Sequence, residues 1–160
     1  MRFQAISLVM GVFSSIVSAE PLFRERPNPP NCPPRPVSPQ QQRVIWESFF
    51  HKFFVERNAT GAVLEFFAED YIQHNPDVLS GRDVAAKALS FMSPETINIT
   101  VINRGKEGDI AFVYAQWDIF SLPRPNANVD MFRFNGSCIQ EHWDVIQPWP
   151  VNATNPLAMW

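Results

Sequence analysis

Acidic and histidine side chains gather near the end of the chain, at spacings that suit acid–base chemistry. Residues 141–144 read Glu-His-Trp-Asp, and Asp130 stands shortly before them. Carboxylate and imidazole groups are common general bases and acids, because burial and neighbouring charges tune their pKa values. If the face that carries Asp130 lines an apolar pocket, burial raises its pKa toward the range of a useful base. Asp130 is therefore a candidate catalytic or ligand-binding residue.

These residues lie in a predicted β-hairpin, Val129–Pro148. The Asn-Gly dipeptide at 135–136 is a strong turn signal, and apolar residues alternate with polar ones on both sides of it. His142 and Asp144 are two residues apart, so they share one face of a strand, whereas Trp143 lies on the other. Alternation does not decide which face is inward. Either His142 and Asp144 form an acid–base pair in the interior, or Trp143 lines the cavity instead.

His74 is a third candidate, in a segment that must turn because Pro76 follows it. A histidine here can cap backbone groups. With Asp77 nearby it can also be held in one tautomer and donate a hydrogen bond to a substrate carbonyl. The chain has three histidines, but none shows the His-x-His or His-x-x-x-His spacing typical of metal sites. We therefore expect no metal.

The rest of the chain predicts helices first and strands afterwards. Ser38 followed by Pro39 is a helix start, and apolar residues recur at three- and four-residue spacings after it. The expected elements are helices at Gln40–Arg57, Ala62–Ala68 and Val84–Met92, an extended piece at Glu69–Pro76, and strands at Thr96–Arg104 and Ile110–Phe120 ahead of the hairpin. This order indicates an α+β fold, with helices packed on a curved, mainly antiparallel sheet that encloses a pocket.

The N-terminus has the pattern of a secretory signal peptide over residues 1–19. Arg2 supplies the positive start, an apolar stretch follows, and residues 17–19 form a small-residue cleavage site. We therefore expect a secreted, extracellular protein with no membrane span in the mature chain, because the apolar stretch is short. Four Asn-X-Ser/Thr sequences agree with secretion. The predicted glycosylation sites are Asn58, Asn98, Asn135 and Asn152.

Residues 20–39 are expected to form a proline-rich arm, residues 40–148 a single domain and residues 149–160 a tail. In an oxidising compartment the two cysteines, Cys32 and Cys138, are expected to form one disulfide that ties the arm to the hairpin. A catalytic thiol is the alternative.

The formal net charge of -3, with no basic stripe, argues against a nucleic-acid partner. The 14 phenylalanines and 5 tryptophans suffice for one core and the walls of a cavity.

Three segments carry a resemblance to a known family: EDYIQHNP, SGRDVAAKAL and VDMFRFNGSCIQEHWDVIQP. They resemble the SnoaL-like polyketide cyclase family of the nuclear transport factor 2-like superfamily, whose members are cone-shaped α+β barrels. The resemblance covers Val44–Pro148. In characterised relatives a carboxylate removes a proton next to a carbonyl and an intramolecular aldol condensation follows, without cofactor or metal. The superfamily also contains isomerases, dehydratases and non-catalytic modules.

By position, the resemblance implies Asp130 as the base, with His74 and His142 as its partners. It also implies a homodimer formed through the outer face of the sheet. The expected ligand-binding residues are Trp117, Tyr114, Phe132, Trp143 and Asp144. We therefore expect a cofactor-independent cyclase or isomerase that acts on a hydrophobic carbonyl compound. The alternative is a non-catalytic extracellular module that binds a small hydrophobic molecule or a protein.

Overall fold

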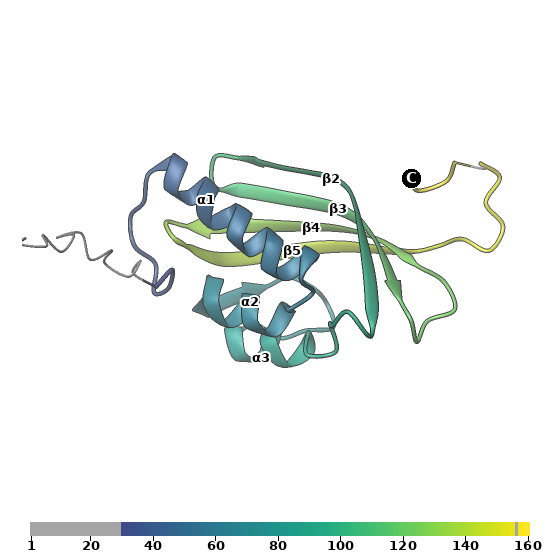
Figure 1. The fold of residues 1–160 in the computed structure, drawn as a ribbon, viewed down its shortest axis with the longest axis horizontal. Helices are drawn as coiled ribbons and strands as arrows, with labels where there is room; N and C mark the ends of the chain where they lie inside the picture. The colour runs from purple at the N-terminus through teal and green to yellow at the C-terminus, as the bar shows by residue number, and fades with distance from the viewer. Residues whose placement is uncertain (1–29, 156) are drawn as a thin grey trace, which may run out of the picture.

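A five-stranded sheet carries three helices on one side (Figure 1). The structure is a computed structural model and describes residues 30–155 and 157–160. The predicted signal peptide and the start of the predicted arm lie outside the described residues. None of the described helices is long and apolar enough to cross a membrane. The elements are α1 (Pro39–Phe50), η1 (His51–Val55), α2 (Ala59–Phe66), β1 (Phe67–Gln73), α3 (Arg82–Ala88), β2 (Ile97–Glu107), β3 (Ile110–Ile119), β4 (Asn126–Asn135) and β5 (Cys138–Pro148).

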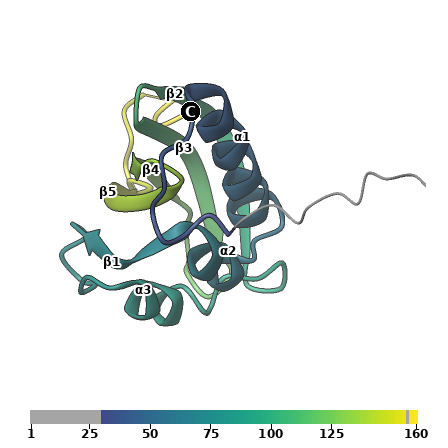
Figure 2. The ribbon, with the colours of Figure 1, turned by 90° about the vertical axis from the view of Figure 1, so that its left-hand side faces the viewer.

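The strands follow the order β1-β5-β4-β3-β2, and the sheet does not close on itself among the described residues. β2 to β5 pair as antiparallel neighbours, whereas β1 pairs with β5 in parallel. In Figure 2 the sheet curves around α1, while α2 and α3 lie close to β1. The predicted α+β fold, with helices packed on a curved and mainly antiparallel sheet, is therefore confirmed.

The helix starts follow the local signals in the sequence. The Ser38 hydroxyl accepts a hydrogen bond from the backbone N–H of Gln41, whose side chain returns a bond to the Ser38 backbone. The Asn58 side chain caps α2 in the same way by accepting from the N–H of Gly61. The predicted single helix over Gln40–Arg57 is wrong at its end, because the chain passes into the π-helical turn η1 after Phe50.

Aromatic side chains fill the space between α1 and the sheet. Phe132 on β4 lies at their centre, and its ring contacts Phe49 at a centroid distance of 5.0 Å and Trp46 at 6.0 Å. Phe53 and Phe67 pack around the same ring. Burial of this many large apolar side chains is the main stabilising contribution of the fold, because apolar surface leaves water.

The proline-rich arm is fastened to the turn between β4 and β5. Cys32 and Cys138 form a disulfide. The backbone N–H of Ser137 donates to the carbonyl of Arg35 at 3.1 Å, and the Arg35 N–H donates to the Ser137 hydroxyl at 3.1 Å. Gly136 has φ +55°, and a Cβ there would lie 2.2 Å from the Arg35 carbonyl oxygen. Only glycine fits, because any side chain would collide with the arm.

We predict that the double variant Cys32→Ala/Cys138→Ala unfolds more easily than the wild type. The disulfide joins residues 106 positions apart, and a cross-link over so long a loop restricts the unfolded chain strongly. The expected loss in the free energy of unfolding is about 2–5 kcal/mol, measured by urea titration. Reduced wild-type protein is the matched control and should lose a similar amount. Equal urea midpoints for oxidised wild type and double variant would contradict this prediction.

Candidate functional site

A cavity of about 260 Å³ lies between the concave face of the sheet and the segment that contains β1 and α3. Its apolar walls come from phenylalanines of η1, β1 and β4 and from aliphatic residues of α3 and β3. Its polar side chains come from β3, β4 and β5, and from β1 with the loop that follows it. The polar and aromatic-polar residues that line the cavity are Tyr71, Gln73, Asn75, Asp77, Trp117, Asn126, Asn128, Asp130, His142 and Asp144.

Asp130 and His142 form a buried pair in this cavity. They are diagonal neighbours across the β4–β5 ladder, where Asp130 pairs with Asp144 and Phe132 pairs with His142, and the His142 Nε2 lies 3.2 Å from the Asp130 Oδ1. Asp130 is 4% exposed and His142 is 8% exposed. Burial raises the pKa of the Asp130 carboxyl above its usual value, since a charge is unfavourable away from water. The hydrogen bond and charge of His142 act against this rise, and the negative charge of Asp144 adds to it.

Gln73 on β1 sets the tautomer of His142. The Gln73 Oε1 accepts hydrogen bonds at 3.0 Å from the backbone N–H groups of His74 and Asn75, which identifies this atom as the oxygen. The His142 Nδ1 lies 2.9 Å from the same oxygen and must therefore carry a proton to donate. It follows that Nε2 and the Asp130 carboxyl share one further proton. The pair is either a carboxylic acid with neutral imidazole or a carboxylate with imidazolium.

A β-bulge orients this pair inward. Phe134 pairs with Ile139, but the next pair is Arg133 with Glu141, so β5 has one extra residue at this point. Ile139 before the bulge faces the core, and His142 after it faces the cavity. The face of β5 that carries His142 and Asp144 is therefore the inner one, and Trp143 lies on the outer face.

Asp144 and Asn75 form a second polar pair at the cavity. The Asn75 Nδ2 donates to both carboxylate oxygens of Asp144, at 2.9 and 2.7 Å. The Asn75 Oδ1 accepts from the backbone N–H of Asp77 at 2.8 Å and so turns the amide toward Asp144. The carboxylate of Asp144 is thus held in one orientation, next to the Asp130–His142 pair.

Tyr71 adds a neutral hydroxyl to the cavity wall. Its side chain is 1% exposed. Burial, together with the charges of Asp144 and Asp130, raises the pKa of Tyr71 well above its usual value. Tyr71 therefore stays protonated at any physiological pH and can donate a hydrogen bond to an oxygen that gains negative charge.

Asp130, His142 and Asp144 also offer donor atoms that all lie within 4.8 Å of one another, as metal ligands do. Their atoms already take part in hydrogen bonds, from His142 to Asp130 and from Asn75 to both oxygens of Asp144. A metal ion bound to the His142 Nε2 or to Asp144 would have to replace these bonds, whereas the Asp130 Oδ2 has no hydrogen-bond partner among the described residues. The prediction that the protein uses no metal stays a prediction, and a chelator is a necessary control in any assay.

The structure places three of the predicted site residues away from the cavity. The His74 Nε2 lies 2.8 Å from the Glu141 Oε1, and its ring stacks on Trp143 at 4.7 Å, on the opposite face of β5 from His142. Hydrogen bonds from His74 and Arg133 hold the pKa of Glu141 below its usual value. Tyr114 lies on the outer face of β3, where its hydroxyl donates to the carbonyl of Met159. The other predicted residues, namely Trp117, Asp130, Phe132, His142 and Asp144, line the cavity together.

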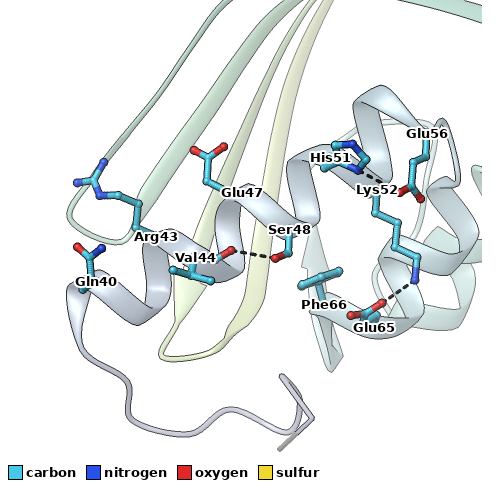
Figure 3. A pocket seen from close by; sticks show the side chains of 10 residues that line it. All are labelled: Gln40, Arg43, Val44, Glu47, Ser48, His51, Lys52, Glu56, Glu65 and Phe66. Carbon is cyan, nitrogen blue, oxygen red and sulfur yellow. Dashed lines mark hydrogen bonds and ion pairs between the residues drawn. The ribbon is translucent and has the colours of Figure 1, made fainter. Parts of the chain in front are cut away.

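A broad groove on the surface of α1 and α2 is another large hollow among the described residues (Figure 3). Its charged side chains pair with one another: Lys52 with Glu65 at 2.6 Å, and His51 with Glu56 at 3.0 Å. His51, Glu56 and Glu65 are exposed to solvent and Lys52 is half-buried. The groove therefore offers less chemistry than the cavity.

Sequence reasoning missed five polar residues of the cavity: Tyr71, Gln73, Asn75, Asn126 and Asn128. Their positions contain a usable signal. Tyr71 and Gln73 alternate along β1, and Asn128 is two residues before Asp130 on β4, so each shares a face with a cavity residue. The missing information was the neighbour of β1, because parallel pairing with β5 is what brings Gln73 to His142.

Comparison with known proteins supports the fold. No protein-family model matches the sequence, and no curated protein matches it. Among solved structures, a candidate ketosteroid isomerase from Kribbella flavida is similar with a TM-score of 0.57, at 15% identity over 75% of this chain and 93% of that chain. A candidate polyketide cyclase from Bacillus cereus has a TM-score of 0.54, at 13% identity over 71% of this chain and 86% of that chain.

A protein of unknown function from Burkholderia xenovorans, described as nuclear transport factor 2-like, has a TM-score of 0.57 at 14% identity, over 71% of this chain and 88% of that chain. Identities this low carry information about the fold alone. The element order, the curved sheet and these likenesses agree with the fold expected from the resemblance. The chain therefore has the cone-shaped α+β fold of the nuclear transport factor 2-like superfamily.

Proposed function

We propose that the protein is a cofactor-independent acid–base enzyme, a cyclase or isomerase that acts on a hydrophobic carbonyl compound in the cavity. The observation that carries the proposal is the buried Asp130–His142 pair, whose imidazole tautomer is set by Gln73. A carboxylate with a raised pKa, in contact with an imidazole, is suited to move protons near neutral pH.

In the proposed reaction the ionised Asp130 removes a proton from the carbon next to the substrate carbonyl. The C–H bond breaks, the proton goes to the carboxylate, and the electron pair moves onto the carbonyl oxygen to form an enolate. Tyr71 donates a hydrogen bond to this oxygen, since its phenol is neutral.

The enolate then has two possible fates. In an isomerase, Asp130 returns the proton to a different carbon. In a cyclase, the enolate carbon attacks a second carbonyl of the same molecule, and the resulting alkoxide takes the proton. Both routes balance without an oxidant, a reductant or a co-reactant. His142 stabilises the carboxylate when it is charged and shares the proton when it is not.

The similarity in fold to a candidate ketosteroid isomerase and a candidate polyketide cyclase supports this reaction class. The alternative is a module that binds a small molecule in the same cavity and performs no chemistry. The two differ in one observable, which is exchange of the protons next to the carbonyl of a bound ketone.

We predict that the wild-type protein accelerates exchange of these protons for deuterium in D₂O, and that Asp130→Asn slows this exchange by about 10²-fold or more. The asparagine amide can still donate to the His142 Nε2, so the site keeps its shape while the base is lost. The measurement is proton NMR of acetophenones and indanones with and without protein, in the presence of a chelator.

Asp118→Asn is the matched control, because it removes one carboxylate from β3 at a residue that does not line the cavity. It should exchange at the wild-type rate. Binding of the ketones without faster exchange in the wild type would favour the non-catalytic module. Equal rates in wild type and Asp130→Asn would rule out Asp130 as the base.

The buried carboxylate also predicts a characteristic pH dependence of stability. The pKa of Asp130 is raised in the folded state, so the folded protein holds this proton to higher pH than the unfolded chain does. The contribution to stability is fully present below the ordinary pKa of about 3.8 and is lost as pH rises through the raised folded-state value.

We therefore expect the free energy of unfolding of the wild type to fall, relative to Asp130→Asn, as pH rises above about 4. Urea titrations from pH 4 to 8 on both proteins measure this difference, and exchange rates should rise with pH over the same window. The pKa of Glu141 is lowered in the folded state, so its contribution to the free energy of unfolding increases as pH rises. This contribution is the same in both proteins and cancels when they are compared. Parallel curves for the two proteins would contradict the prediction.

Secretion, glycosylation and dimerisation stay predictions. The four predicted glycosylation asparagines are all exposed, which agrees with access by a glycosyltransferase. At Asn58 a glycan would occupy the amide nitrogen and leave the oxygen free to cap α2. The outer face of the sheet exposes an apolar row that would suit the predicted homodimer: Phe112, Val129, Met131 and Val145.

A further inference from the structure

Three side chains on the cavity wall bury polar atoms that have no hydrogen-bond partner among the described residues. They are the Nε1 of Trp117, the Oδ1 of Asn128 and the Oδ2 of Asp130. The three residues are 6%, 3% and 4% exposed, respectively, and all three line the cavity. Most buried polar groups in folded proteins are paired, because an unpaired one is unfavourable.

The three residues form one patch on neighbouring strands. Trp117 on β3 pairs with Asn126 on β4, and Asn128 and Asp130 follow on β4 at alternate positions. Their side chains therefore point to the same, concave face of the sheet. The same cavity is also lined by the apolar residues Phe53, Phe67 and Leu89.

Each atom of the patch requires a particular partner. The indole N–H of Trp117 can only donate, so it requires an acceptor oxygen on the ligand. The ionised Asp130 can only accept. The Asn128 amide oxygen lacks a partner and requires a donor, which a hydroxyl group can supply. A ligand that has an acceptor oxygen and a separate hydroxyl group can therefore pair with both Trp117 and Asn128.

The shape of the cavity limits the rest of the ligand. Its volume of about 260 Å³ is below the usual range for drug-sized ligands, about 300–1,000 Å³. The aromatic rings of Phe53, Phe67 and Phe132 provide flat, apolar contacts on its walls. A compact ring fits these surfaces, whereas a long acyl chain does not.

We propose that the substrate is a compact cyclic or aryl ketone that carries a hydroxyl group. Its ring lies against the phenylalanines, an oxygen accepts from the Trp117 indole, and the hydroxyl binds Asn128. This assignment rests on the proposed function of the cavity and names the substrate class for it. Trp117 and Asn128 act as specificity-determining residues, while Asp130 performs the chemistry.

The test compares ligands that differ only in the hydroxyl. Acetophenone is titrated against its 2-, 3- and 4-hydroxy derivatives and the matching methoxy compounds by isothermal titration calorimetry. We expect at least one hydroxy compound to bind wild-type protein about 10-fold or more tightly than acetophenone, because a site with buried polar atoms discriminates against ligands that leave them unpaired. The methoxy compounds cannot donate and should lose most of this preference.

Three variants locate the effect. Asn128→Leu should remove the preference for the hydroxyl and bind acetophenone at least as well as wild type, and Trp117→Phe should weaken binding of all the ketones. Asn103→Leu, on the exposed surface of β2, is the matched control and should behave as wild type. Thermal unfolding checks that each variant is folded, and Asn128→Leu should be no less stable than wild type because it removes an unpaired buried group.

The outcome is independent of catalysis. Asp130→Asn should keep the preference for the hydroxyl even where it abolishes exchange, so failure of the proposed chemistry and failure of this assignment are distinguishable. Equal affinity of wild type for hydroxy and unsubstituted compounds would overturn the assignment. So would a hydroxyl preference that survives Asn128→Leu, or the absence of binding by every compound at millimolar concentration.

Discussion

A chain of hydrogen bonds from Gln73 through His142 to Asp130 ties together three strands and determines the chemistry of the cavity. It crosses from β1 to β5 to β4. Two backbone N–H groups orient the Gln73 oxygen, that oxygen requires a proton on the His142 Nδ1, and the remaining nitrogen can then share only one proton with Asp130. If the parallel pairing of β1 with β5 were lost, Gln73 would no longer fix the tautomer of His142. Asp130 would then no longer have a partner in a defined protonation state.

Burying the hydrogen-bonded residues His142 and Asp130 lowers the stability of the fold. Asp130 is buried in a molecule whose core is dense with phenylalanine, and burial of a carboxylate is unfavourable. The aromatic cluster around Phe132 offsets this cost, and the Phe132 ring also packs against the His142 imidazole at 4.8 Å. The disulfide and the contacts of the arm with the β4–β5 turn stabilise the other end of the same hairpin. Stability and the proposed function therefore depend on the same two strands.

Much of the architecture could be predicted because its signals are local. The Ser38-Pro39 start of α1, the alternation in β3 and the turn near Gly136 each depend on residues adjacent in sequence. The inward direction of Asp130 followed from its alternation with Phe132 and Phe134. Simple alternation would place Ile139 with Glu141 and Trp143, whereas the bulge after Phe134 lets Ile139 enter the core and turns His142 inward. A bulge depends on the pairing of two strands and has no clear signal in either one.

The amino-acid sequence alone was enough for the α+β class, the order of the elements, the cysteine pair and the candidate base Asp130, because these depend on composition, periodicity and short motifs. The tertiary structure alone decided that Gln73 contacts His142, that Asn75 holds Asp144, and that His74, Tyr114 and Trp143 lie outside the cavity. These outcomes depend on which strand lies beside which. The parallel partner of β1 comes from the far end of the chain, at a separation over which local periodicity carries no information.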